Sequence, residues 1–230
     1  CIFESYTRCE IPSAVLGPAE GQTTLFGTEA IATDPTHARR VANGLTRLGP
    51  MVRARVMTGF LSTEEEKDLI LLRFARRCFD EGPRAVQMLG DPDVHAAFVL
   101  ERNVNNEVCR FIEFIRFEEK DGMLGSVIHP KNNVLPLLRG HFCSRLPDED
   151  FLIFDAAHGT ALLRQSGHVQ YLAMEHYEPA RDADELNWQA LWKRFFHALT
   201  IEERRNAKAQ MNHAPKRFWG GMVEMREPYI

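Results

Sequence analysis

The spacing of apolar residues changes along the chain, and this change predicts helices, then a sheet, then helices again. Up to about residue 110, apolar residues recur at intervals of three and four, which is the period of an amphipathic α-helix. Residues 111–175 instead hold short β-branched and aromatic segments between turn residues, which is typical of strands. Helical spacing returns from about residue 183.

Local start and stop signals set the bounds of the helices in the first half. Asp-Pro pairs at 34–35 and 91–92 each place an N-cap before a proline at the first helical position. Ser62 and Glu65 have the spacing of a capping box, which predicts a third helix start. Gly-Pro pairs end two of the expected helices, which cover residues 35–48, 51–60, 62–81 and 92–109.

The second part is predicted to form a mostly antiparallel sheet of about five strands. Asp121-Gly122 is a strong hairpin signal between the first two strands. A helix over residues 134–145, capped by Asn133, is inserted between the second and third strands. The strands are expected at residues 111–117, 123–128, 151–155, 161–164 and 169–174.

Together these elements predict a single α+β domain over residues 1–230, with helices N-terminal to the sheet, inserted in it and C-terminal to it. One C-terminal helix is expected over residues 184–199, and a second begins at Thr200 with Glu203 as its capping partner. The mainly helical part, the sheet with its inserted helix, and the C-terminal helices with a basic segment cover residues 1–110, 111–175 and 183–230.

Composition fits an ordinary globular protein, with 44% hydrophobic and 26% charged residues. No apolar run approaches the ~20 residues that a membrane span needs, and we expect no signal peptide from the pattern at the start of the chain. The 5 cysteines are widely spaced and form no CxxC pair, which favours reduced thiols. We therefore expect a cytoplasmic protein.

Charge is distributed unevenly, although the formal net charge is only −4. Residues 35–63 carry arginines and no acid, and residues 204–217 carry five cations and no acid. The first group consists of Arg39, Arg40, Arg47, Arg53 and Arg55. A basic face on an acidic protein would attract a phosphate backbone. Separate solvated helix faces would account for the same pattern equally well.

The C-terminal segment combines these cations with amides and two aromatic residues. Cations hold phosphates, amides contact bases or sugars, and an aromatic ring can stack on an unpaired base for ~1–3 kcal/mol. The alternative for Phe218 and Trp219 is ordinary packing of the last turn onto the core. The predicted nucleic-acid-binding residues are Arg204, Arg205, Asn206, Lys208, Gln210, Lys216, Arg217 and Trp219.

A second candidate site combines His141, Arg145 and Asp155. His141 and Arg145 are four apart on one expected helix face, and Asp155 ends the next strand, just before His158. Such a group can bind a phosphate or a base, or transfer a proton, so these three are the candidate catalytic residues. The structural alternatives are an Arg145–Asp155 ion pair and a core histidine at position 141.

Other charged residues are expected to have structural roles. Glu113 and Arg116 would point to opposite faces of the first strand, because side chains alternate there. An inward-facing charge needs a partner, so Arg116 is expected to pair with a carboxylate inside the fold. Glu107 and Arg110 are three apart and predict a solvated ion pair on a helix.

Histidines are common in the sheet region, but they do not have the spacing of a metal site. Four fall in that part of the chain, and no two have HxH or HExxH spacing. We therefore predict neither a metal nor another cofactor. The four are His129, His141, His158 and His168.

Two blocks of residues carry a resemblance to a known family. The first block comprises Phe114-Ile-Arg-Phe117, Gly122-Met-Leu, Ile128-His-Pro130, Val134-Leu-Pro-Leu-Leu138, His141-Phe142, Ser144-Arg145-Leu146 and Phe151-Leu-Ile-Phe-Asp155. The second comprises Leu191-Trp192-Lys193, Phe195-Phe196, Ile201-Glu-Glu-Arg-Arg-Asn206, Gln210 and Pro215-Lys-Arg-Phe-Trp219. In these residues the chain resembles a bacterial family linked to DNA metabolism and DNA repair.

The resemblance implies partners rather than a reaction. Members of this family are expected to act with a radical-SAM protein, and in some the same domain is joined to a uracil-DNA glycosylase-like domain. The leading hypothesis is a DNA-binding accessory protein of repair or modification. An enzyme acting on damaged bases or nucleotides, or a protein–protein scaffold, are the alternatives.

Overall fold

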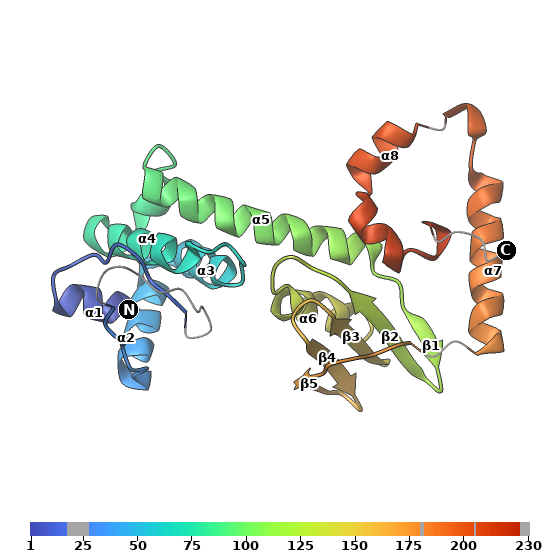
Figure 1. Ribbon diagram of the computed structural model, residues 1–230, viewed down its shortest axis with the longest axis horizontal. Helices are drawn as coiled ribbons and strands as arrows, with labels where there is room; N and C mark the ends of the chain where they lie inside the picture. Colours follow the sequence, from blue (N-terminus) through green and yellow to red (C-terminus); the bar gives the residue numbers. More distant parts are fainter. Residues whose placement is uncertain (18–27, 180–181, 205, 226–230) are drawn as a thin grey trace. The chain divides into compact units, whose positions relative to one another are not determined.

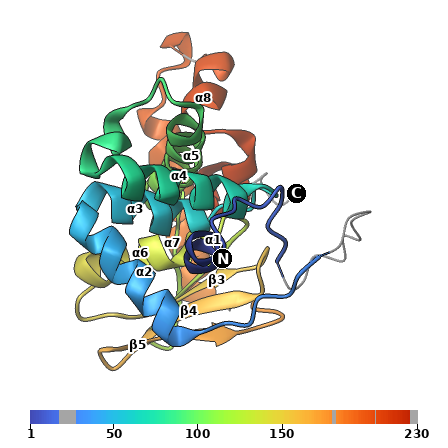
Figure 2. The ribbon, with the colours of Figure 1, turned by 90° about the vertical axis from the view of Figure 1, so that its left-hand side faces the viewer.

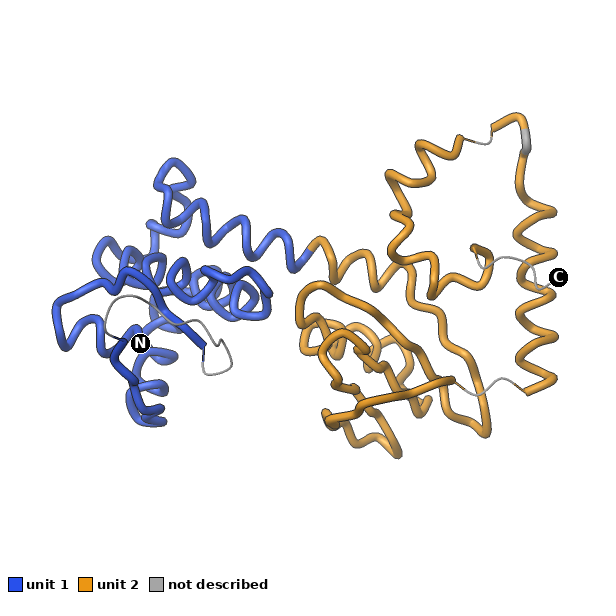
Figure 3. Tube along the Cα trace, viewed as in Figure 1, with its two compact units in different colours: residues 1–105 blue, residues 106–230 orange. Residues whose placement is uncertain are grey.

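The fold was analysed in a computed structural model of the chain, which describes residues 1–17, 28–179, 182–204 and 206–225. It contains two compact units, Cys1–Asn105 and Asn106–Ile230 (Figure 3). The sequence predicts a single domain instead, with a change of character near residue 110, and that interpretation stays a prediction.

The first unit is helical. Helices α2, α3 and α4 are neighbours, and α1 packs against α2 and α4 (Figure 2). Their apolar faces enclose a core centred on Phe74, Ala75 and Cys78, which are fully buried. The elements are α1 (Ile2–Thr7), α2 (Pro35–Leu48), α3 (Pro50–Phe60), α4 (Lys67–Glu81), the 3-10 helix η1 (Pro83–Gln87) and α5 (Pro92–Phe114), which continues into the second unit.

Two of the three helix starts predicted in the first half of the chain are confirmed. The Asp34 carboxylate accepts the amides of Thr36 and His37, and the Asp91 carboxylate accepts the amides at 93 and 94. The capping box is wrong, because α4 begins only at Lys67. The hydroxyl of Ser62 accepts the amide of Glu64 instead, which makes a local turn ahead of the helix.

Arg55, in the first unit, has a structural role and does not lie on the surface. The Arg55 guanidinium is buried, lies 2.8 Å from the Glu101 carboxylate and donates to the carbonyl oxygen of Val86. It also lies over the Phe74 ring. Arg55 therefore does not belong to a basic surface formed by residues 35–63.

The second unit contains the predicted sheet, and the fold is α+β with a mostly antiparallel sheet (Figure 1). Its five strands follow the order β1-β2-β3-β4-β5, and only β2 and β3 pair in parallel. The parallel pair needs a crossover, which α6 (Leu135–Arg145) supplies. The strands are β1 (Glu118–Lys120), β2 (Met123–Ile128), β3 (Asp150–Asp155), β4 (Thr160–Gln165) and β5 (His168–Ala173).

The predicted first strand over residues 111–117 is wrong, because α5 continues to Phe114. Val104, Val108 and Phe111 repeat at helical spacing and are buried, so the apolar segment extends the helix. The strand begins only at Glu118. The hairpin turn after it is confirmed, since Asp121 and Gly122 have φ angles of 51° and 75°.

The inserted helix α6 is present, but its predicted cap is wrong. Its N-cap is Val134 and no side chain caps it, so Asn133 does not have that role. Three residues of α6 are buried, and one of them, Phe142, contacts the ring of Phe117 at 5.4 Å. The same Phe117 ring lies 6.1 Å from Phe151 of β3, so the link before β1 helps to pack α6 onto the sheet.

Two helices follow the sheet, α7 (Ala183–Leu199) and α8 (Ala207–His213). The predicted helix start at Thr200 is wrong, because its hydroxyl donates to the Phe196 carbonyl and closes the end of α7. Asn206 caps α8 instead. Three 3-10 segments complete the unit, η2 (Glu202–Arg204), η3 (Lys216–Gly221) and η4 (Val223–Met225). No helix among the described residues is long and apolar enough to cross a membrane.

Candidate functional site

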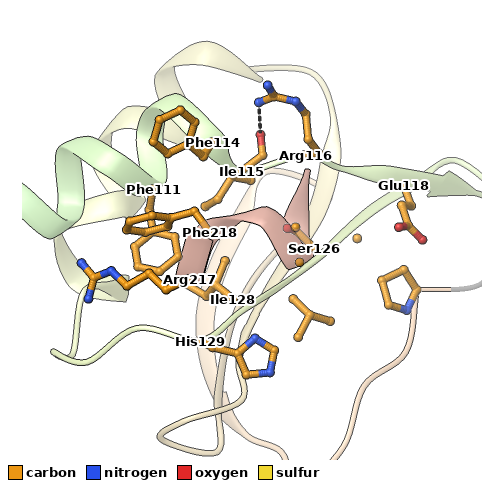
Figure 4. A pocket seen from close by; sticks show the side chains of 15 residues that line it. Phe111, Phe114, Ile115, Arg116, Glu118, Ser126, Ile128, His129, Arg217 and Phe218 are labelled. Carbon is orange, nitrogen blue, oxygen red and sulfur yellow. Dashed lines mark hydrogen bonds between the residues drawn. The ribbon is translucent and has the colours of Figure 1, made fainter. Parts of the chain in front are cut away.

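The second unit contains a cavity of about 250 Å³ above strand β2 (Figure 4). The last turn of α5 and segment η3 form its walls, and the second half of β2 lies along it. These segments are distant in sequence, so the cavity exists only in the folded unit. Its lining residues include Phe111, Phe114, Glu118, Gly125, Ser126, Ile128, His129, Arg217 and Phe218.

One end of the cavity is aromatic. The Phe218 ring lies 5.0 Å from that of Phe111, edge to face, and 5.6 Å from that of Phe114. The Arg217 guanidinium lies 4.6 Å from the centre of the Phe218 ring. The side chain of Phe218 is buried, so these rings form a fixed apolar wall.

The other end of the cavity is polar. Glu118 and Ser126 are buried, and His129 is exposed at the end of β2. Tyr177 approaches β2 at Gly125, where an added Cβ would lie only 2.0 Å from the tyrosine hydroxyl oxygen. Burial raises the pKa of Tyr177, and the nearby charge of Glu118 adds to the effect. A ligand in this cavity would meet rings at one end and hydrogen-bonding groups at the other.

A buried carboxylate, that of Glu107, holds one side of the cavity together. It accepts the backbone amides of Lys131 and Asn132 at 2.9 and 2.8 Å, and the Asn132 side-chain amide at 2.7 Å. It also lies 3.1 Å from the Arg217 guanidinium. The expected Glu107–Arg110 pair is therefore wrong. Arg110 binds Glu113 and the His213 carbonyl instead.

A second buried carboxylate, that of Glu224, confirms the prediction that Arg116 pairs inside the fold. The Arg116 guanidinium lies 3.0 Å from Glu224, whose side chain is only 3% exposed. The indole N–H of Trp192 donates to the other oxygen of the same carboxylate. Arg116 follows α5 rather than lying in a strand, and its guanidinium donates to the Ile115 carbonyl (Figure 4).

The predicted basic segment is spread over three short elements of the second unit. Arg204 lies in η2, Lys208 in α8 and Lys216 in η3, and all three are exposed. In the parts of the chain that the structure describes, none of the three pairs with a carboxylate. The Lys216 ammonium lies 5.9 Å from the centre of the Trp219 ring. Arg205 falls outside the described residues.

The remaining residues of this segment make internal contacts. Asn206 accepts the Ala209 amide as the cap of α8, and the Gln210 side chain contacts the sulfur atom of Met225. Trp219 donates its indole N–H to the Ala214 carbonyl at 2.8 Å. Among the described residues of the predicted set, Arg217 alone both lines the cavity and binds a buried carboxylate.

The candidate catalytic residues do not form one bonded group. Arg145 ends α6 and lies just before β3, whereas Asp155 ends β3, and a six-residue strand is about 17 Å long. Across the described ranges, no hydrogen bond or ion pair joins Asp155 to His141 or Arg145. The alternative of a structural Arg145–Asp155 ion pair is therefore wrong. His141 contacts the Phe142 ring.

Asp155 pairs with His158, its neighbour in the turn after β3. The Asp155 carboxylate is fully buried, lies 2.7 Å from the Nδ1 atom of His158, and accepts the amides of Ala157 and His158. Burial raises the pKa of Asp155, and the bonds to His158 oppose this effect. The pair has the geometry in which a carboxylate orients an imidazole.

Metal ligands do not gather within the described residues, where no group of three His, Cys, Asp or Glu side chains is close enough to hold an ion. Sequence reasoning missed Glu107 and Glu118 as members of the site. The sequence does contain a signal for Glu107. It lies on the helix face that Val104, Val108 and Phe111 form, and a charged residue at such an apolar position must be buried with partners.

Comparison with known families gives one match. A family model described as a domain of unknown function, DUF4130, matches residues 65–224. The match covers more than half of the chain, so the chain belongs to this family. No curated protein and no solved structure matches the chain.

Proposed function

We propose that this member of the DUF4130 family binds DNA that carries an unpaired or damaged base, as an accessory protein of repair or modification. The observation that carries the proposal is a cavity with an aromatic wall. Segment η3 forms part of that wall and also bears exposed cations. Stacked rings suit a base, and cations suit the phosphates beside it. The family resemblance to DNA-repair proteins supports the same assignment.

The phosphate contacts are assigned to Arg204, Lys208 and Lys216. These side chains are exposed and, within the described residues, remain without a carboxylate partner, so their charge is available to a ligand. Arg217 differs from them, because Glu107 already balances its charge. Its role is to fix η3 against the end of α5 beside the cavity.

The base is assigned to the cavity. The rings of Phe111, Phe114 and Phe218 offer an apolar surface at one end. At the other end the carboxylate of Glu118 can accept a hydrogen bond from an exocyclic amino group, and the hydroxyl of Ser126 can donate or accept one. Such a site favours a base that has left the stack, since a paired base cannot enter a cavity.

The partner is assigned from the resemblance. A radical-SAM protein, or a protein with a uracil-DNA glycosylase-like domain, would supply the chemistry in the cytoplasm, and this chain would hold the DNA. This division of labour requires that the chain bind DNA in the absence of its partner.

The proposal is tested by fluorescence anisotropy with single-stranded, duplex, uracil-containing and abasic oligonucleotides over a range of salt concentrations. The variant Lys208→Glu/Lys216→Glu should weaken binding and reduce the salt slope by about 1.4 on single strands, or ~0.7 per lost phosphate contact. The control Lys120→Glu/Arg139→Glu makes the same change in net charge at other exposed positions of the unit. Salt-independent binding, or equal effects of both variants, would contradict the proposal.

A second variant tests the cavity separately from the charges. Ser126→Val places a larger β-branched side chain along β2, where such residues are well tolerated, and reduces the space for a base. It should remove the preference for unpaired or damaged bases and leave the salt slope unchanged. An unchanged preference would show that the base does not enter this cavity.

A further inference from the structure

Helix α7 leaves its most apolar face exposed to solvent. Trp188, Leu191, Trp192, Phe195 and Leu199 are spaced by three and four residues, so they share one face, here called the α7 stripe. All five side chains are exposed, from 41% for Trp192 to 68% for Trp188. Among its seventeen residues, all of which are described, none is buried. An amphipathic helix ordinarily buries such a stripe.

One flank of the stripe is already in use. The carboxylate of Glu185 accepts the Glu119 amide of β1, and Gln189 donates to the same carboxylate. Trp192 reaches Glu224 at the edge of the stripe. These polar contacts fix the rotation of the helix, so the stripe cannot turn inward without breaking them.

A groove of about 570 Å³ runs beside the stripe. Trp188, Leu191 and Phe195 line one side of it, and Phe117 and Val223 lie on the other. A groove with apolar walls beside an exposed apolar helix is the form of site that receives another amphipathic helix.

The charges along α7 select the orientation of a pair. The helix begins with Asp182, Asp184 and Glu185 and carries Lys193, Arg194 and His197 in its second half. Asp184 and Glu185 flank the stripe, whereas Lys193, Arg194 and His197 lie on other sides of the helix. Two copies of α7 in antiparallel orientation keep their acidic starts at opposite ends of the pair, and their helix dipoles also oppose. A parallel pair would bring like charges together.

The exposed area is sufficient for such a pair. With ~150–250 Å² for each aromatic side chain, the exposed fractions of the stripe amount to about 500 Å² for each copy. Two copies would bury about 1,000 Å², which is the lower bound for a specific interface. A continuous apolar patch of about 500 Å² is near the upper end of what a monomer exposes, and such patches are often interaction sites.

We propose that α7 is a homodimerisation helix, through which two copies of this chain pair antiparallel about a two-fold axis. The α7 stripe of each copy packs into the groove beside the α7 helix of the other. A two-fold interface uses the same surface on both subunits, and only the antiparallel orientation keeps the acidic starts of the two helices apart. The inference does not depend on DNA binding.

The test is the molar mass of the full chain in solution, by light scattering and sedimentation equilibrium, from about 1 to 100 µM, the range expected for an interface of minimal size. We expect a reversible dimer. Phe195→Glu should weaken dimerisation about 30-fold or more. Phe60→Glu is the matched control, because Phe60 is 58% exposed and Phe195 is 54% exposed, and it should have no effect.

Orientation is tested with one nitroxide label per chain at Ala183→Cys or Ala190→Cys, in a background in which the four cysteines outside the core are serine. In an antiparallel pair the separation of the two labels along the helix axis should be about 20 Å larger at 183 than at 190, given a rise of ~1.5 Å per residue, so the label-to-label distance should be clearly longer at 183. Equal distances would overturn the antiparallel arrangement. A chain that remains monomeric at the highest concentration would overturn the proposal. That outcome includes the case in which a different protein, and not a second copy of this chain, covers the stripe.

Discussion

Replacing Glu107 by glutamine should destabilise the second unit strongly, although the two side chains have the same shape. The Glu107 carboxylate receives three N–H donors from Lys131 and Asn132, and the Arg217 guanidinium lies 3.1 Å from it. Glutamine has one acceptor oxygen, so its amide nitrogen must face N–H donors whichever way it turns.

The expected cost follows from these contacts. Each oxygen takes part in two of the four contacts, and a hydrogen bond to a charged group contributes about 1.5–3 kcal/mol. Glu107→Gln should therefore lower the free energy of unfolding by about 3–5 kcal/mol. Arg217→Gln should cost at most about 1 kcal/mol, because the guanidinium is half exposed and Glu107 keeps its other donors.

Tryptophan fluorescence during urea unfolding measures the stability loss of the two variants in the second unit. The three tryptophans, Trp188, Trp192 and Trp219, all belong to the second unit, so their signal reports its unfolding alone. The two variants remove opposite charges, and each is compared with the unsubstituted chain. Equal losses for both, or a loss below about 1 kcal/mol for Glu107→Gln, would refute the claim that this carboxylate organises the cavity wall.

Two further predictions concern packing and pH. Gly125→Ala should destabilise the second unit by about 1–3 kcal/mol through its clash with the Tyr177 hydroxyl. Adding Tyr177→Phe to this variant removes the hydroxyl and leaves the ring carbon Cζ, 3.0 Å from the new Cβ, as the nearest tyrosine atom. Urea unfolding should then show that much of the lost stability is recovered, and no recovery would contradict this account. Burial raises the pKa of Cys78 to about 11. The stability that the protonated thiol contributes is therefore fully present below the pKa that Cys78 has in the unfolded chain, and it is lost as the pH rises towards the folded value. From pH 8 to 10, the free energy of unfolding relative to Cys78→Ala should fall by about 1.5 kcal/mol. A difference between the two proteins that does not change with pH would contradict this prediction.

The sequence predicted those features of the fold that depend on neighbouring residues. The caps at Asp34 and Asp91, the turn at Asp121-Gly122 and the later strands all follow from residues a few positions apart. The segment after residue 110 was misassigned, because a short apolar run fits a buried helix end and a strand equally well. There the packing of Phe111 and Phe114 against Phe218 decides in favour of the helix.

The candidate site was harder to predict, because its contacts join distant parts of the chain. The need of Arg116 for a carboxylate was foreseeable from the cost of burying a charge. Its partner, Glu224, lies 108 positions away, and no local pattern identifies it. Glu107 and Arg217 present the same problem. The family match over residues 65–224 establishes membership but assigns no role to these residues.

The single parallel pair in the sheet has a consequence for the order of folding. Strands β3, β4 and β5 are joined by short turns, and such hairpins close in about 1–10 µs. Strand β2 aligns Met123 with Asp150, so it can join them only after α6 and its connections have closed a much longer loop. We therefore expect the β3–β5 meander to be the nucleus and β2 to arrive late. Until it arrives, the edge of β3 is open to pairing with other chains.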